Sequence, residues 1–274
     1  MFSSPSDIAD FTVNVGVRKT NMSVINQFIL GILAGAFIAF GAQASNFVTH
    51  TIYDISTAKF IGGLIFPAGL MLVLMAGAEL FTGNCLMIMA LAEKQISLTQ
   101  LLRSWLVVYL GNLAGSILVA FLISWSGQLG CTAGLLGGFT IKAAVGKISL
   151  PFTQAFVLGI LCNWLVCLAV WTSFGAKDGI SKAVCVFFPI WLFVASGFEH
   201  SIANMYYIPA GILAKCNPSY VTKALELGAS QSAIDSLSWC SMFTKNLLPV
   251  TLGNILGGAG FVGCAYWFVY RKGR

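Results

Sequence analysis

Two polar strings with the same spacing lie inside strongly apolar sequence and hold the residues best suited to chemistry. Both read Gly-x-Glu-x-x-x-x-Asn, over residues 77–84 and again over residues 197–204. The shared members are Gly77, Glu79 and Asn84 in the first copy and Gly197, Glu199 and Asn204 in the second. A carboxylate at bilayer depth is costly and usually marks a functional site. The repeated string therefore predicts a membrane pore that arose by duplication.

The positions at which the two copies differ are the candidates for the pore chemistry. Leu80 aligns with His200, and Thr82 aligns with Ile202, so each copy contributes one polar and one apolar residue. A lone histidine in apolar sequence is usually a hydrogen-bonded core residue. His200, however, adjoins a predicted helix break, has no counterpart in the other copy and has a candidate partner in Thr82. His200 is therefore predicted to donate a proton to an anion or to trap it electrostatically.

The residues that both copies share are predicted to serve the fold, because a role that each half needs is structural. A helix break leaves backbone N–H and C=O groups without partners, and a buried Glu or Asn side chain can supply them. We assign this role to Glu79, Asn84, Glu199 and Asn204. A proton relay through the two glutamates is the alternative.

The elements that position these residues belong to a polytopic membrane protein. The chain has 274 residues, of which 58% are hydrophobic and 9% charged, whereas soluble domains carry about 25% charged residues. One crossing needs about 20 apolar residues. Two of the six apolar runs are longer, and each contains one string, which predicts a crossing interrupted by non-helical backbone. The runs cover about 26–48, 60–92, 102–125, 152–174, 183–214 and 247–270.

Two further matches extend the strings into an internal repeat. The segment LGIL at 30–33 recurs at 158–161, and LGN at 110–112 recurs at 252–254. Three crossings per half would give the halves opposite orientations. We therefore predict an all-α, aquaporin-like fold of six transmembrane helices in two inverted repeats. Its parts are a cytoplasmic amphipathic segment (1–23), the first repeat (24–127), an extracellular linker (128–150) and the second repeat with a short cytoplasmic tail (151–274).

Both ends of the chain are predicted to be cytoplasmic. The first 23 residues are too polar for a signal peptide, and all four arginines fall in segments predicted to be cytoplasmic. Ile8, Phe11 and Val15 follow helical spacing, which predicts a helix on the membrane face, with a frayed tail as the alternative. The eight cysteines and two histidines form no metal or cofactor motif. We expect no metal, no cofactor, no enzymatic activity and no nucleic-acid partner.

Bulky apolar residues near the predicted breaks are candidates for barriers that exclude hydrated ions, with ordinary packing as the alternative. These residues are Phe66, Leu70, Leu80 and Phe193. The segment between Gly127 and Pro151 carries Lys142 and Lys147 and no acidic residue. Unopposed cations at a pore mouth raise the local anion concentration, although exposed lysines often serve solubility alone.

At these residues the chain resembles the formate/nitrite transporter family of anion channels. The resemblance lies in AELFTGN around Glu79, LGILCNWLVCLAVW from Leu158, ASGFEHSIANM with IPAGI from Ala195, and NLLPVTLGNILGG from Asn246. It implies an aquaporin-like fold of six crossings and a homopentamer with one pore per protomer. It also implies a place in the inner membrane with both termini in the cytoplasm.

The resemblance also implies roles for single residues. Thr82 and His200 would form the central polar site, with Glu199 beside it and Asn254 lining the pore. Lys147 would attract the anion, and the hydrophobic constrictions would fall on Phe66, Leu70, Leu80 and Phe193. The first break reads Thr-Gly-Asn, where formate-carrying relatives often have small hydroxyl residues after the threonine. Formate, nitrite and hydrosulfide therefore stay open as the preferred anion.

The expected function is passage of a small monovalent weak-acid anion, with or without protons, across the lipid bilayer. The anion would take a proton or have its charge compensated at His200, because a bare anion between apolar rings loses its hydration. The nearest alternative is an aquaporin-class channel for neutral solutes, although neither Asn84 nor Asn204 precedes Pro-Ala. A cation-coupled carrier that uses Glu79 and Glu199 is a weaker alternative. A quinone- or haem-linked enzyme lacks ligands, because His200 is the single central imidazole.

Overall fold

The structure is a computed structural model that describes residues 2–273, and within this range the chain forms helices and no strand. The first half contains α1 (Pro5–Asn21), α2 (Val24–Thr49), α3 (Ile55–Ile65), α4 (Pro67–Ala76), α5 (Phe81–Asn84), η1 (Cys85–Met87), α6 (Ile88–Ala92) and α7 (Leu98–Trp125). Next come η2 (Gln128–Gly130), α8 (Leu135–Ile148), α9 (Phe152–Gly175), α10 (Gly179–Ala195), α11 (Ser201–Ala214), α12 (Pro218–Glu226) and α13 (Gln231–Ser236). The chain ends with α14 (Trp239–Ser241), the π-helical η3 (Met242–Leu247), α15 (Leu248–Ile255), the π-helical η4 (Leu256–Cys264) and α16 (Ala265–Tyr270).

Five helical segments are long and apolar enough to cross a membrane. They are Val24–Thr49, Ile55–Ala76, Leu98–Trp125, Phe152–Gly175 and Trp239–Tyr270. The fifth predicted run is divided between α10, with 17 residues, and α11, with 14 residues. Each of these two helices is shorter than a full span of about 20 residues.

Both long runs are interrupted where the polar strings predict a break. Gly77 ends α4 with φ +83°, and Gly197 follows α10 with φ +73°. Glycine enters this left-handed region without the steric penalty of a Cβ, so it can terminate a helix there. Helix α5 then begins at Phe81 and α11 at Ser201.

Asn112 on α7 holds the first break together. Its Nδ2 donates to the carbonyl oxygens of Gly31 (2.8 Å) and Glu79 (2.9 Å), and its Oδ1 accepts from the Phe81 N–H (2.9 Å). One buried amide therefore ties α2, the break and the start of α5. These are the backbone groups that a broken helix leaves without partners.

Asn254 on α15 makes the same three bonds at the second break. Its Nδ2 donates to the carbonyl oxygens of Gly159 (2.8 Å) and Glu199 (3.0 Å), and its Oδ1 accepts from the Ser201 N–H (2.9 Å). The prediction that the Glu and Asn side chains of the strings form hydrogen bonds with the free backbone groups at the breaks is therefore wrong. Asn112 and Asn254 lie outside the strings, and their side chains fill that role.

Glycines let the helices that carry these asparagines approach their neighbours closely. A Cβ on Gly115 of α7 would overlap the carbonyl oxygen of Ile32 on α2, and a Cβ on Gly257 would overlap that of Ile160 on α9. Because the asparagine side chains are short, this close approach brings their amides within hydrogen-bond distance of the broken segments.

Gly115→Ala should destabilise the protein by roughly 1–3 kcal/mol, because the added methyl forces α2 and α7 apart. Gly146→Ala on α8 is the control, since a Cβ there meets nothing within 4 Å. Thermal unfolding in detergent, followed by tryptophan fluorescence, should show a lower midpoint for Gly115→Ala alone. Equal midpoints for the two variants would contradict the close approach.

Helix α1 packs on protein through one face. Of the three residues predicted to form its apolar face, Ile8 is buried, whereas Phe11 is 43% exposed and Val15 half-buried. The buried face is instead formed by Ile8, Ala9, Thr12, Val13, Gly16 and Thr20. This face contacts α6, α9 and α16.

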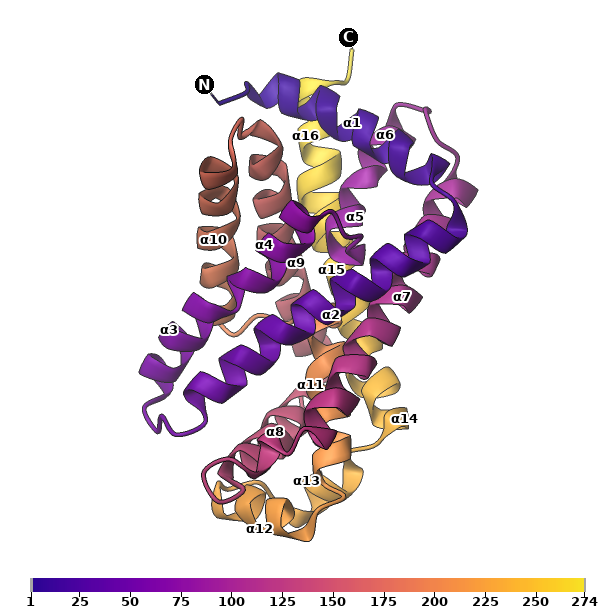
Figure 1. Ribbon diagram of the computed structural model, residues 1–274. Helices are drawn as coiled ribbons and strands as arrows, with labels where there is room; N and C mark the ends of the chain where they lie inside the picture. Colours follow the sequence, from indigo (N-terminus) through magenta and orange to yellow (C-terminus); the bar gives the residue numbers. More distant parts are fainter. Residues whose placement is uncertain (1, 274) are drawn as a thin grey trace.

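The two ends of the chain lie at the same end of the molecule (Figure 1). Arg271, just after α16, forms ion pairs with Asp10 of α1 and with Glu93. Its hydrogen bond holds the pKa of the Glu93 carboxyl below the usual value. These contacts fix α1 against the bundle.

The segment predicted as an extracellular linker is largely helical. Residues Leu135–Ile148 form α8, which packs against α11 and α12 at the end opposite α1 (Figure 1). Lys147 lies in the last turn of this helix. A rigid element therefore carries the lysine.

Candidate functional site

His200 and Thr82 meet at the centre of the molecule, as the sequence predicts. The His200 Nε2 and the Thr82 Oγ1 are 2.9 Å apart, and both side chains are buried. His200 is the N-cap of α11, and its Nδ1 accepts a hydrogen bond from the Ala203 N–H (3.1 Å). Because Nδ1 accepts there, the neutral ring carries its hydrogen on Nε2 and donates it to Thr82. Within residues 2–273 the Thr82 hydroxyl hydrogen has no acceptor.

Apolar side chains adjoin this pair on both sides. The rings of Phe66 and Phe193 meet edge to face at 5.6 Å, and Phe193 lies 5.9 Å from the His200 ring. Leu70 and Leu80 are also buried, at 2% and 3% exposed. The structure thus brings Phe66 and Phe193 together next to His200, while Leu70 and Leu80 are buried separately.

Two separate cavities end at these apolar residues. The larger, about 500 Å³, is lined by Phe66, Phe193 and His200 and contains Lys147; we call it the Lys147 vestibule. The smaller, about 300 Å³, is lined by Leu70 and Leu80 and contains Lys19; we call it the Lys19 vestibule. The two cavities share no lining residue. Thr82 lines neither cavity, whereas His200 lines the Lys147 vestibule, so the central pair lies at the inner end of that vestibule.

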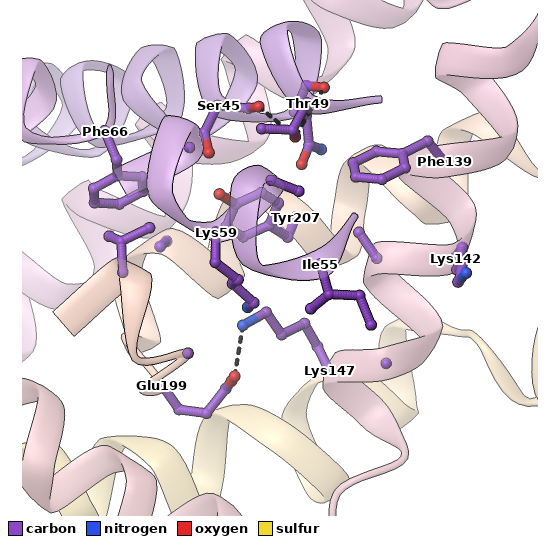
Figure 2. A pocket seen from close by; sticks show the side chains of 18 of the residues that line it. Ser45, Thr49, Ile55, Lys59, Phe66, Phe139, Lys142, Lys147, Glu199 and Tyr207 are labelled. Atoms are coloured by element: carbon purple, nitrogen blue, oxygen red, sulfur yellow. Dashed lines mark hydrogen bonds and ion pairs between the residues drawn. The ribbon is translucent and has the colours of Figure 1, made fainter. Parts of the chain in front are cut away.

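Lys147 pairs with the carboxylate of the second string. Its Nζ donates to Glu199 Oε1 at 2.5 Å (Figure 2). Glu199 Oε2 accepts from Asn204 Nδ2 at 2.7 Å. The Glu199 side chain is only 4% exposed. Lys147 also lies 5.7 Å from the centre of the Tyr207 ring. The lysine at the mouth thus neutralises the carboxylate beside His200.

Lys19 plays the equivalent part at the first string. Its Nζ donates to Glu79 Oε2 (2.8 Å) and Asn84 Oδ1 (2.7 Å), and Asn84 Nδ2 donates to the same Glu79 oxygen (2.8 Å). The sequence did not single out Lys19 as a partner of Glu79. The duplication could have pointed to it. Glu79 and Glu199 occupy equivalent positions in the two strings, and a buried carboxylate at either position needs a cation nearby.

Both vestibules contain more cations than carboxylates. Lys59, Lys142 and Lys147 line the first together with Glu199. Arg18, Lys19 and Lys182 line the second together with Glu79. Fields of one sign in a cleft raise the local concentration of the opposite ion.

Asn254, for which the resemblance implies a pore-lining place, holds the second break. Its side chain is fully buried, uses its bonding groups at the second break and lines neither vestibule. In the part of the chain that the structure describes, no three His, Cys, Asp or Glu side chains form a possible metal site.

The comparison with known families follows this geometry. Residues 6–268 match the family model described as formate/nitrite transporter. The chain belongs to the formate/nitrite transporter family. It is 39% identical to a probable formate transporter of Methanothermobacter thermautotrophicus over 99% of this chain and 98% of that relative. It is 38% identical to the formate channel FocA of Escherichia coli (strain K12), over 98% of this chain and 94% of that relative.

A solved structure agrees with the family. The chain superposes on a pentameric formate channel with formate bound, with a TM-score of 0.79 and 37% sequence identity. The superposition covers 91% of this chain and 98% of the solved one. As a member of the formate/nitrite transporter family with five apolar, span-length helices, the protein is a multi-pass membrane protein of a transport family.

Proposed function

We propose that the protein conducts small monovalent weak-acid anions, formate first, with nitrite and hydrosulfide as further candidates. The observation that carries this proposal is the buried pair of His200 and Thr82, whose Nε2–H and hydroxyl group offer donors between two cation-rich vestibules. The formate channels among its relatives support formate as the substrate.

The anion is concentrated by the lysines of a vestibule and then reaches an apolar constriction. Crossing Phe66 and Phe193 as a bare anion would cost its hydration, since these rings offer no hydrogen bond. A weak acid avoids this cost by crossing as the neutral acid. The proton therefore travels with the anion.

His200 can relay this proton through its two ring nitrogens. A proton from the Lys147 vestibule binds Nδ1 once the Ala203 N–H releases it, and the resulting imidazolium passes its Nε2 proton to the anion. The bond from Ala203 opposes this step, so the ring stays neutral until an anion arrives. Lys147 forms an ion pair with Glu199 beside the ring.

For the architecture we propose six crossings in two inverted repeats, with α10 and α11 together making the fifth crossing. The matching bonds of Asn112 and Asn254, and of Lys19 and Lys147, support this symmetry. We further propose a homopentamer in the inner membrane bilayer, with one pore per protomer and both termini in the cytoplasm. The pentameric relative and the distribution of the arginines support these points.

Formate uptake into liposomes that contain the purified protein tests the proposal. We expect uptake well above that of empty liposomes, and uptake equal to that of empty liposomes would contradict it. The aquaporin-class alternative predicts rapid glycerol uptake instead. The excess of cations in both vestibules favours the anion channel over that alternative.

Phe66→Ala should raise chloride leakage through the protein roughly tenfold, because chloride cannot be neutralised by a proton and the ring supplies much of its barrier. Phe60→Ala is the matched control, since Phe60 lies on the same helix and is 52% exposed on the outside. Chloride-loaded liposomes with a fluorescent indicator measure the leak. A leak unchanged from the wild type in Phe66→Ala would show that the barrier lies elsewhere.

A further inference from the structure

The Lys147 vestibule holds a second ammonium group that no carboxylate neutralises. Lys59 on α3 places its Nζ beside the Nζ of Lys147, over Glu199 (Figure 2). It also lies above the second break, where a Cβ on Gly197 would be 3.3 Å from this Nζ. Among residues 2–273, Lys59 makes no hydrogen bond or ion pair.

Glu199 has no oxygen left for Lys59. Its Oε1 accepts from Lys147, and its Oε2 accepts from Asn204 and, at 3.5 Å, from Asn246. Two ammonium groups therefore lie around one carboxylate. The two ammonium groups repel each other, and together with the single carboxylate they leave a net charge of +1. A monovalent anion in the vestibule would balance this charge.

Asn46 on α2 contributes an unpaired amide to the same cavity. Its side chain is 95% buried, lines the Lys147 vestibule, and its Nδ2 has no hydrogen-bond partner within the described chain. The neighbouring Ser45 packs against α3, because a Cβ on Gly62 would lie 2.7 Å from Ser45 Oγ. Gly62 is one helical turn beyond Lys59 on α3. A buried N–H without a partner is costly, and a ligand oxygen would satisfy it. Rotation about χ2 turns the amide toward such a ligand.

We propose that Lys59, Asn46 and Lys147 form a capture subsite for a monovalent carboxylate in the Lys147 vestibule. One carboxylate oxygen accepts from the Lys59 ammonium group and the other from the Asn46 amide, while Lys147 stays on Glu199. The subsite holds the anion in the vestibule before it passes Phe66, Phe193 and His200, which line the same cavity. This inference rests on the proposed function and adds where the substrate first binds.

The half-saturating formate concentration for uptake from the Lys147 side tests the subsite. Lys59→Gln should raise it about tenfold with little change in maximal flux, because a charge-assisted hydrogen bond to the anion is lost. Asn46→Asp should raise it at least as much, since the new carboxylate occupies the place of the ligand. Lys59→Arg keeps the positive charge, so its half-saturating formate concentration should lie near the wild-type value.

Lys142→Gln is the matched control for charge. Lys142 lines the same cavity but is exposed, and its Nζ donates to the Leu227 carbonyl oxygen at 2.7 Å. This variant should raise the half-saturating concentration less than about twofold, as expected for a screened surface charge. Equal shifts for Lys59→Gln and Lys142→Gln would overturn the subsite and leave only a general positive field.

Binding of ¹³C-formate to the detergent-purified protein, followed by NMR line broadening, separates the subsite from conduction. Weaker formate binding in Lys59→Gln than in the wild type is expected. If the wild type carries no formate, the proposed function fails, while this binding difference still decides the subsite. Equal binding by the two proteins would overturn the subsite even where formate flux is normal.

Discussion

Lys147→Glu should reduce formate flux about 100-fold, in keeping with the cost of breaking a buried ion pair. The substitution removes the partner of Glu199, whose side chain is 4% exposed, and sets a second carboxylate beside it. The Lys147 vestibule then holds two lysines against two carboxylates, so it no longer concentrates anions. Formate flux into liposomes at equal protein content is the measurement.

Lys142→Glu makes the same change of charge in the same cavity and serves as the control. Lys142 is exposed and pairs with no carboxylate, so its reversal should lower flux only a few-fold. Size-exclusion chromatography of both variants shows whether they assemble like the wild type. A comparable loss of flux in the two variants, with normal assembly, would mean that the Lys147–Glu199 pair has no special role.

His200→Leu should nearly abolish flux, whereas His200→Asn should retain part of it and lose its pH dependence. Leucine removes the acceptor for the Ala203 N–H and the donor toward Thr82. Asparagine can keep both bonds, because its side chain caps helices well and its amide donates, but it cannot carry a proton. In the wild type flux should rise as the pH falls, since each crossing needs a protonated ring.

Formate flux measured at several pH values between about 5 and 8, the range in which histidine ordinarily titrates, distinguishes these cases. A flat profile in His200→Asn supports the relay through the imidazole. If His200→Asn instead keeps the wild-type profile, the anion takes its proton from the vestibule water, and His200 serves as a hydrogen-bond donor alone.

The sequence was informative where a residue type has a direct physical consequence. The duplicated glycines mark the breaks because the left-handed conformation at Gly77 and Gly197 favours glycine. The comparison of the two strings pointed to Leu80, Thr82 and His200, and the structure brings Thr82 and His200 into contact. The six apolar runs and their strings predicted six crossings with two interruptions, and the structure shows five span-length helices and a fifth run divided between α10 and α11.

The rest depended on contacts between residues far apart in the chain. Asn112 and Asn254 hold the breaks from other helices, and close helix packing at Gly115 and Gly257 makes this possible. Lys19 reaches Glu79 across 60 positions of sequence because α1 packs on the bundle. No periodicity within α1 signals that contact.

The selectivity of the reconstituted protein among formate, chloride and glycerol tests the central claim most directly. The three fluxes are measured in one preparation of liposomes, with formate and chloride under the same ion gradient. We predict rapid formate flux, much slower chloride flux and glycerol flux no greater than in empty liposomes. Rapid glycerol uptake without anion flux would contradict the account, and chloride flux equal to formate flux would contradict passage as the neutral acid.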